Sequence, residues 1–289
     1  MVLCQAHLQP HGEGVWAGIC FVSFDRYHTK PGCKIALDRV VSSYSSSVKA
    51  IIHTRQQRQD VRAKSSNGVV LVSINETPGM SPLKYPADEI NAVRSVCVSA
   101  GLSAVRPRPC QAETLSALTA CRVFHFAGHG GTHPDPLHSR LCLEDWQDHP
   151  LTVASLLETN LRAGSPFLAY LSACGTGQSL DDDLADESIH LTSAFQLAGF
   201  RHVIGTLWEV DDQLCADMAR MIYKFLGEKG LDNTSVSSGL YYATRTLRDR
   251  WVGEERHAGL GVRGERDAEL CEDAASRALS WIPYVHYSV

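Results

Sequence analysis

Short apolar runs alternate with amphipathic stretches along most of this 289-residue chain. Runs of four to eight residues rich in Val, Ile, Leu and Phe are typical of strands buried on both faces of a sheet. They predict strands at 68–75 and 201–208, and two more strands at the start of the segments 121–131 and 166–177. Helical spacing of apolar residues between these runs predicts helices at 86–101, 113–120, 151–158 and 188–198.

Strands that alternate with helices favour a mainly parallel sheet, because helical crossovers carry the chain back over either face. We therefore predict an α/β fold with a mainly parallel central sheet covered by helices on both faces. Two more helices are expected after the last of these strands, the first capped by Asp211 or Asp212, and Thr152 is a candidate cap for the helix at 151–158. The closing WIPYVHY (281–287) returns as a strand.

Three segments depart from this alternation. Residues 1–35 mix His, Gly, Pro and aromatic residues without a period, and we interpret them as a separate N-terminal segment, truncated in this chain. Residues 53–67 are polar and basic, as in a solvated connection. The remaining domain spans 36–289 and carries a polar, Gly-rich insertion at 251–270.

Two strand ends carry reactive side chains among small residues. The run CRVFHFAGHGG (121–131) ends around His129, and PFLAYLSACGTG (166–177) ends around Cys174. Carboxyl ends of parallel strands are where open α/β sheets place their sites. An imidazole can draw the proton from a nearby thiol and later protonate a leaving amine, while the backbone amides of Gly130 and Cys174 can face an oxyanion. The pair indicates a cysteine protease. His125, four residues earlier, is expected inside the strand against a covering helix.

Four blocks of the sequence carry a family resemblance: HFAGHG, LSACGTG, SAFQLAGFRHVIGTLWEVDD (193–212) and WIPYVHYSV (281–289). In order and spacing they resemble the CHAT domain, a caspase-like, separase-related domain, here of the fungal type. LDRVVSSYSSSVKAII (37–52) is similar to the segment before the first core strand of that family. The resemblance implies that His129 is the catalytic His and Cys174 the nucleophile. The separation of the two residues also matches a caspase-type arrangement, with the His about 50 residues upstream of the Cys.

Several carboxylates follow the strands that end at the same edge. The stretch from Asp181 to Glu187 follows Cys174, and Glu209, Asp211 and Asp212 follow the next strand. Glu209, Asp211 or Asp212 would favour Arg or Lys at the cleavage position through a charge-assisted hydrogen bond. The competing interpretations are a solvated loop for the first stretch and helix capping for Asp211 and Asp212.

Composition narrows the classes of partner. A hydrophobic fraction of 44% and a charged fraction of 20% are those of a globular chain. The formal net charge of -5 offers no field for a polyanion, so nucleic acid is not expected as a partner. No apolar run is long enough to cross a membrane. The ten cysteines are scattered without a CxxC pair or a secretory leader, which favours the cytoplasm.

No cofactor or metal is expected. The group His125, His129, His133 and Cys142 contains zinc-ligand types, but its spacing lacks the paired ligands of structural zinc sites. The expected partner is a protein or peptide substrate, and the family resemblance adds a sensor or repeat-domain partner outside this chain, because no internal repeats are present. Two alternatives remain open: an idle caspase-like interaction or signalling module, and a cysteine hydrolase of small amides.

Overall fold

The computed structural model describes residues 3–8, 15–18, 40–45, 67–159, 161–173, 191–207, 210–257 and 284–288. Its centre is a mixed sheet, which within these ranges has nine strands in the order β2-β1-β3-β12-β11-β10-β6-β4-β5. Their bounds are β1 Leu3–Leu8, β2 Val15–Gly18, β3 Val40–Ser45, β4 Gly68–Ser73, β5 Ser103–Val105, β6 Val123–Ala127, β10 Leu168–Ser172, β11 His202–Thr206 and β12 Tyr284–Ser288.

The middle of the sheet is parallel, as the alternation of apolar runs predicts. Strands β5, β4, β6, β10 and β11 run in one direction, and β12 pairs with β11 in the opposite direction. Every residue of β6, β10 and β11 is buried, because helices cover both faces of these strands. The predicted strands are thus confirmed, each within a few residues of its expected bounds.

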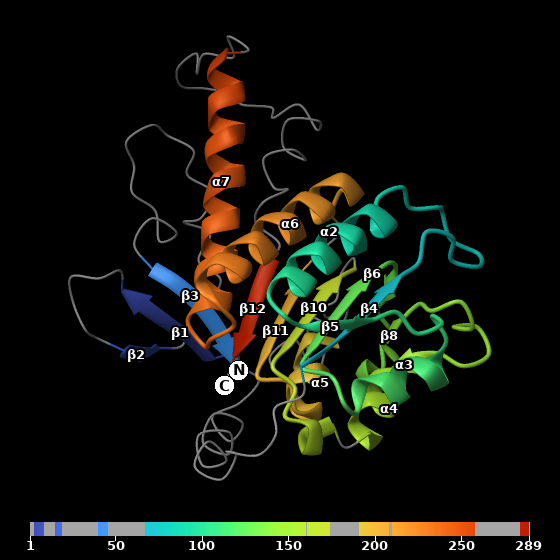
Figure 1. Ribbon diagram of the computed structural model, residues 1–289. Coiled ribbons are helices and arrows are strands. Elements are labelled where there is room, and N and C mark those ends of the chain that lie inside the picture. The colour runs from blue at the N-terminus through green and yellow to red at the C-terminus, as the bar shows by residue number, and fades with distance from the viewer. Residues whose placement is uncertain are drawn as a thin grey trace.

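Helices form a layer on each side of the sheet (Figure 1). One layer consists of α2 Pro86–Ser99, α6 Asp212–Lys229 and α7 Ser235–His257, and the other of α3 Gln111–Leu118, α4 Val153–Glu158 and α5 Leu191–Ala198. Ile90, Ile222 and Leu240 pack in the first core, whereas Leu118 and Phe195 pack in the second. The predicted coverage of both faces is confirmed.

Local signals explain where two of these helices begin. Thr152 caps α4 through a reciprocal capping box, in which its hydroxyl accepts a hydrogen bond from the Ser155 amide at 3.2 Å. Asp211 caps α6, and its carboxylate accepts from the Leu214 amide at 3.1 Å. Helix α7 continues to His257, so residues 251–257 belong to a helix, and 258–270 of the expected insertion lie outside the described residues.

The sheet extends beyond β12 through strands from the first part of the chain. Strand β3 pairs in parallel with β12, and β1 pairs with both β3 and β2. A buried chain of hydrogen bonds joins β3, β12 and β11: Ser43 Oγ to His286 Nδ1 at 2.7 Å, and His286 Nε2 to His202 Nδ1 at 3.0 Å. The range 1–35, which shows no period in sequence, therefore contributes β1 and β2 to the main sheet.

A small second sheet leads away from the carboxyl edge of β6. It consists of β7 Gly130–Gly131, β8 Arg140–Leu141 and β9 Leu151–Thr152, paired antiparallel. The 3-10 helices are η3 Pro136–His138 and η4 Leu161–Gly164. Among the described helices, none is long and apolar enough to cross a membrane.

Candidate active site

His129 lies where the main sheet gives way to the small sheet, directly after β6 and before β7, and it is half-buried. The preceding Gly128 donates its amide hydrogen to the Ser172 carbonyl at 3.1 Å, which ties the end of β6 to β10. A Cβ added at Gly128 would lie 2.9 Å from Cζ of Phe126, too close for any other residue without a shift of that ring. The chain therefore leaves the sheet tightly at Gly128 and presents His129 at the carboxyl edge.

The imidazole of His129 is oriented by a backbone carbonyl. Its Nε2 lies 2.8 Å from the oxygen of Ser81, and a carbonyl oxygen can only accept, so Nε2 carries the proton. Asn75 holds the loop that carries this carbonyl through two hydrogen bonds. The backbone amide of Leu83 donates to the backbone carbonyl of Asn75 at 2.8 Å, and the side-chain amide of Asn75 donates to the backbone carbonyl of Leu83 at 3.0 Å. Nδ1 of His129 remains as the basic nitrogen, as a base facing a thiol requires.

This carbonyl is a component of the site that sequence reasoning missed. The sequence indicates no third partner for the pair, because a backbone oxygen has no sequence signature. Its position follows only from the folded path of residues 75–85.

The end of β10 lies beside the end of β6. The parallel register pairs Ser172 with Ala127. In the sequence, Cys174 comes two residues after Ser172, and His129 comes two residues after Ala127. Thr206, at the end of β11, donates its hydroxyl to the Ala173 carbonyl at 2.9 Å and fixes the last described residue of this segment. Cys174 itself lies outside the described residues, as does the acidic stretch from Asp181 to Glu187.

A narrow pocket of about 30 Å³ opens between these two strand ends, which is room for one or two water molecules. Its lining comes from both strand ends, from the loop before α2, from the first turn of α2 and from the start of α6. The lining residues are Leu83, Pro86, Glu89, Ala127, Gly128, Ser172, Ala173, Val210, Asp212 and Cys215. Two of the lining residues, Gly128 and Ala173, directly precede His129 and Cys174 in the sequence.

The acidic residues after β11 have different surroundings. Asp211 is engaged as the cap of α6, which agrees with the capping interpretation. Asp212 lines the pocket and accepts from the amides of Lys84 at 2.6 Å and Tyr85 at 3.0 Å. Its carboxylate joins the start of α6 to the loop before α2. Glu209 lies outside the described residues.

Replacing Asp211 by Ala is expected to lower the free energy of unfolding by about 1 kcal/mol, because α6 loses its N-cap. Urea denaturation followed by circular dichroism measures the change. Asp217→Ala, in the second turn of the same helix, removes a carboxylate without removing a cap and serves as the matched control. Equal losses in the two variants would contradict the capping role.

The family model of the CHAT domain matches residues 22–257 of this sequence. The chain belongs to the CHAT domain family. The match begins earlier than residue 36, where the sequence resemblance suggests that the domain starts. It includes His129 and Cys174. No curated protein matches the sequence.

Solved structures show the fold that this CHAT domain shares. The separase of Saccharomyces cerevisiae, solved in complex with securin, aligns with a TM-score of 0.50 at 13% identity, over 83% of this chain and 13% of separase. Gingipain R (RgpB), an Arg-specific cysteine proteinase, aligns with a TM-score of 0.49 at 11% identity. The complex of the pro- and mature domains of Porphyromonas gingivalis RgpB aligns with the same TM-score and identity. The alignment with gingipain R covers 78% of this chain and 46% of gingipain R, so the chain spans less than half of either relative. The likeness to separase shows a caspase-like α/β fold.

Other cysteines of the CHAT domain have environments unsuited to nucleophilic attack. Burial raises the pKa of Cys97 to about 12 and that of Cys121 to about 12, so both thiols stay protonated at neutral pH. Burial also raises the pKa of Cys142. Within the described ranges, no group of three His, Cys, Asp or Glu side chains is arranged to hold a metal ion.

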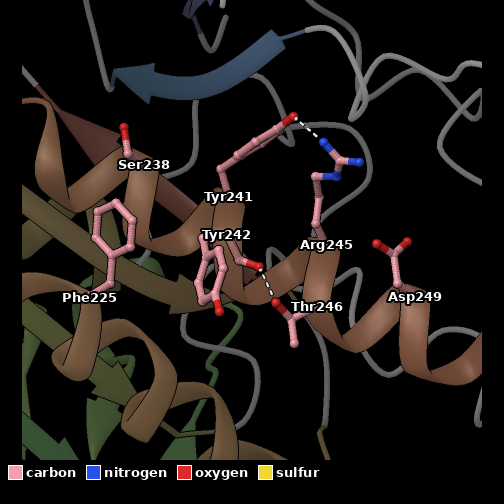
Figure 2. Close-up of a pocket in the computed structure, with 7 residues that line it drawn as sticks. All are labelled: Phe225, Ser238, Tyr241, Tyr242, Arg245, Thr246 and Asp249. Carbon is pink, nitrogen blue, oxygen red and sulfur yellow. Dashed lines mark hydrogen bonds between the residues drawn. The ribbon is translucent and has the colours of Figure 1, made fainter.

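A larger groove of about 340 Å³ lies between α6 and α7, away from these strand ends (Figure 2). Nη1 of Arg245 donates a hydrogen bond to the Tyr241 hydroxyl oxygen at 3.1 Å. Phe225 lines the groove from α6, thirteen residues beyond Asp212, or about 20 Å along the helix. The groove is therefore separate from the candidate active site.

Proposed function

We propose that this CHAT domain is a cysteine endopeptidase that uses His129 and Cys174 as a dyad. The observation that carries the proposal is the hydrogen bond from Nε2 of His129 to the Ser81 carbonyl, which leaves Nδ1 basic at the sheet edge where the Cys174 segment begins. Membership of a family with a caspase-like fold supports the same chemistry.

In this mechanism Nδ1 of His129 takes the proton of the Cys174 thiol, and the thiolate sulfur bonds to the carbonyl carbon of the scissile peptide. Backbone amides of Gly130 and Cys174 stabilise the oxyanion. The carbon–nitrogen bond then breaks, and the imidazolium returns its proton to the leaving amine. Water, deprotonated by His129, hydrolyses the thioester and releases the acid and the thiol. No cofactor enters the cycle.

We expect the peptidase to act on a protein or peptide substrate in a reducing compartment. Among the described residues, Cys97, Cys110, Cys121, Cys142 and Cys215 form no disulfide, which supports a cytoplasmic location. A sensor or repeat-domain partner that regulates the peptidase remains part of the proposal by family resemblance, as does a fungal-type, separase-like role in signalling.

Activity-based labelling tests the proposed function. A peptide carrying a thiol-reactive electrophile should label the purified chain in one position, which peptide mapping should assign to Cys174. A folded chain that neither reacts nor cleaves peptides would instead favour the interaction module, whereas cleavage of small amides alone would favour the amide hydrolase.

Cleavage is expected to follow Arg or Lys, because Asp212 lines the pocket beside the dyad and Glu209 follows the same strand. A positional-scanning peptide library on the purified chain measures the preference, repeated with the variants Asp212→Ala, Glu209→Ala and Asp211→Ala. Asp212→Ala should reduce the preference for basic residues about tenfold or more, whereas Asp211→Ala should leave it unchanged because its carboxylate caps α6. Robust cleavage after Asp would contradict the acidic pocket and leave the dyad in place.

A further inference from the structure

An arginine lies next to His129 on one face of the small sheet. Arg140 of β8 pairs with Gly131 of β7. The same register continues to His129, whose carbonyl accepts a hydrogen bond from the Cys142 amide at 2.9 Å. Side chains alternate between the two faces of a strand, so His129, Arg140 and Cys142 share one face. Arg140 is the diagonal neighbour of His129 across this pairing, and such neighbours lie within about 8 Å.

The opposite face of the small sheet is covered by a core of the main sheet. Leu141, Leu143 and Leu151 are fully buried in that core, so the face with Arg140 is turned away from it. Gly131 adds no side chain to the face of Arg140. A Cβ at Gly131 would lie 3.6 Å from both Cγ and Nε of Arg140. The side chain of Arg140 therefore extends across Gly131, and it is half-buried there.

The indole ring of Trp146 holds the guanidinium in this place. Cζ of Arg140 lies 5.1 Å from the centroid of the Trp146 ring, which is a cation–π contact. Nε1 of Trp146 donates a hydrogen bond to the Pro78 carbonyl at 3.0 Å. Pro78 belongs to the loop after β4 that also carries the Ser81 carbonyl, the partner of His129. One loop therefore positions both the imidazole and the guanidinium.

The charge of Arg140 has no carboxylate beside it in the part of the chain that the structure describes. The ion pairs found there do not include Arg140, and its buried Nε has no hydrogen-bond partner. Burial raises the pKa of the neighbouring Cys142 thiol and outweighs the charge and the hydrogen bond of Arg140, which lower it. The thiol therefore stays neutral, and a neutral sulfur is only a weak acceptor.

The order of the strands places this cation on the side of the leaving amine. Strand β6 lies between β10, which precedes Cys174, and β4, which precedes the loop with Pro78. Along the carboxyl edge, the strand of the nucleophile is therefore followed by His129 and then by Arg140 with Trp146. In the proposed mechanism His129 protonates the leaving amine, so the substrate chain beyond the scissile bond continues past the imidazole towards Arg140. A separation of about 8 Å corresponds to two residues of an extended peptide, at about 3.3 Å per residue.

We propose that Arg140 determines specificity on the leaving-amine side by binding a carboxylate of the substrate, in the first two residues after the scissile bond. A guanidinium binds a carboxylate through two parallel hydrogen bonds, which the ammonium of a Lys cannot reproduce. The carboxylate belongs to an Asp or Glu side chain or to a free C-terminus. The inference rests on the proposed peptidase function and concerns the other side of the scissile bond from the one assigned to Asp212.

Three peptides test the carboxylate requirement on the unaltered chain. They share the residue before the scissile bond that the positional scan selects, or Arg if no cleavage occurs. The first continues with Glu-Glu and the second with Gln-Gln, each followed by a C-terminal amide, and the third ends in a free carboxylate after Gln-Gln. We expect kcat/KM for the first or the third peptide to exceed that for the second by about tenfold or more. Which of the two is preferred identifies the source of the carboxylate, and equal values for all three would overturn the role of Arg140.

The variant Arg140→Gln should remove this preference and leave cleavage of the Gln-Gln amide unchanged. A merely structural role of Arg140 would instead lower the rates for all three peptides by the same factor, and that result would overturn the inference. Arg108→Gln removes the same charge from the exposed surface near Glu144 and is the matched control, which should keep the preference. Arg140→Lys keeps the charge without the fork and should lose most of the preference. Circular dichroism establishes that each variant is folded, and if the Arg140 variants are not, the three peptides on the unaltered chain decide.

Binding to Cys174→Ala separates this inference from the peptidase. Fluorescence anisotropy with labelled forms of the same peptides measures affinity without any reaction. Arg140-dependent preference for a carboxylate, in a chain that neither reacts with the electrophile nor cleaves peptides, would support the carboxylate site and contradict the peptidase. Labelling of Cys174 and cleavage of all three peptides at one rate would support the peptidase and overturn the carboxylate site.

Discussion

Replacing Cys174 by Ala is expected to abolish labelling by a peptide electrophile and to lower the rate of peptide cleavage by at least about 10⁴-fold, as removal of a nucleophile does in other hydrolases. The thiol forms the bond to the scissile carbon in the proposed mechanism, so its removal leaves the reaction without a nucleophile. The loss should appear in kcat and in kcat/KM, measured with a fluorogenic peptide. Thermal unfolding should change little, because the substitution removes one sulfur atom.

Cys110→Ala is the matched control for that variant. Cys110 is a free cysteine at the start of α3 and is partly exposed, so it is open to adventitious alkylation. Labelling that persists in Cys174→Ala but disappears in Cys110→Ala would overturn the assignment of the nucleophile. Retained cleavage in Cys174→Ala would overturn the mechanism.

Regular patterning made the central fold predictable. Helix α2 follows from apolar Ile90, Val93 and Cys97, which the structure buries together, and from Gly101 beyond its end, where φ is +77°. The strands β6 and β10 follow from mainly apolar runs, because both of their faces are covered. His125 was predicted inside its strand against a helix, and its contacts with Glu89 of α2 and Tyr223 of α6 confirm this.

Elements that depend on distant partners escaped prediction. Strands β1 and β2 show no period in sequence, and their pairing with the sheet through β3 depends on an edge that β12, from the far end of the chain, provides. Asp211 and Asp212 are adjacent and chemically alike, yet one caps a helix and the other lines the pocket. Only the direction in which each residue leaves the helix end decides between these roles.

The candidate site also contains residues that the sequence predicts and groups that it does not. His129 and Cys174 could be named because a reactive side chain among glycines at a strand end is a local pattern. The Ser81 carbonyl and Glu89 could not, since one has no side-chain signal and the other occupies an ordinary polar position in the first turn of a helix, where acidic residues are common. Both reach the site from segments about 40 residues before His129 in the chain.

The buried pair of Glu89 and His125 also makes a stability prediction. Replacing His125 by Leu is expected to lower the free energy of unfolding by about 3–5 kcal/mol, because the buried Glu89 carboxyl group loses its 2.8 Å partner in the pair. Replacing Glu89 by Leu should cost less, about 1–3 kcal/mol, because it leaves an unpaired but neutral imidazole N–H. Urea denaturation measures both, with the exposed Val98→Ala as a control for small surface changes.

The double variant Glu89→Leu/His125→Leu decides whether the pair or the packing is responsible. If the loss in His125→Leu comes from an uncompensated charge, then removing the carboxylate as well should restore a large part of the stability, since apolar side chains can replace a buried pair. Additive losses would mean that each side chain contributes through packing alone.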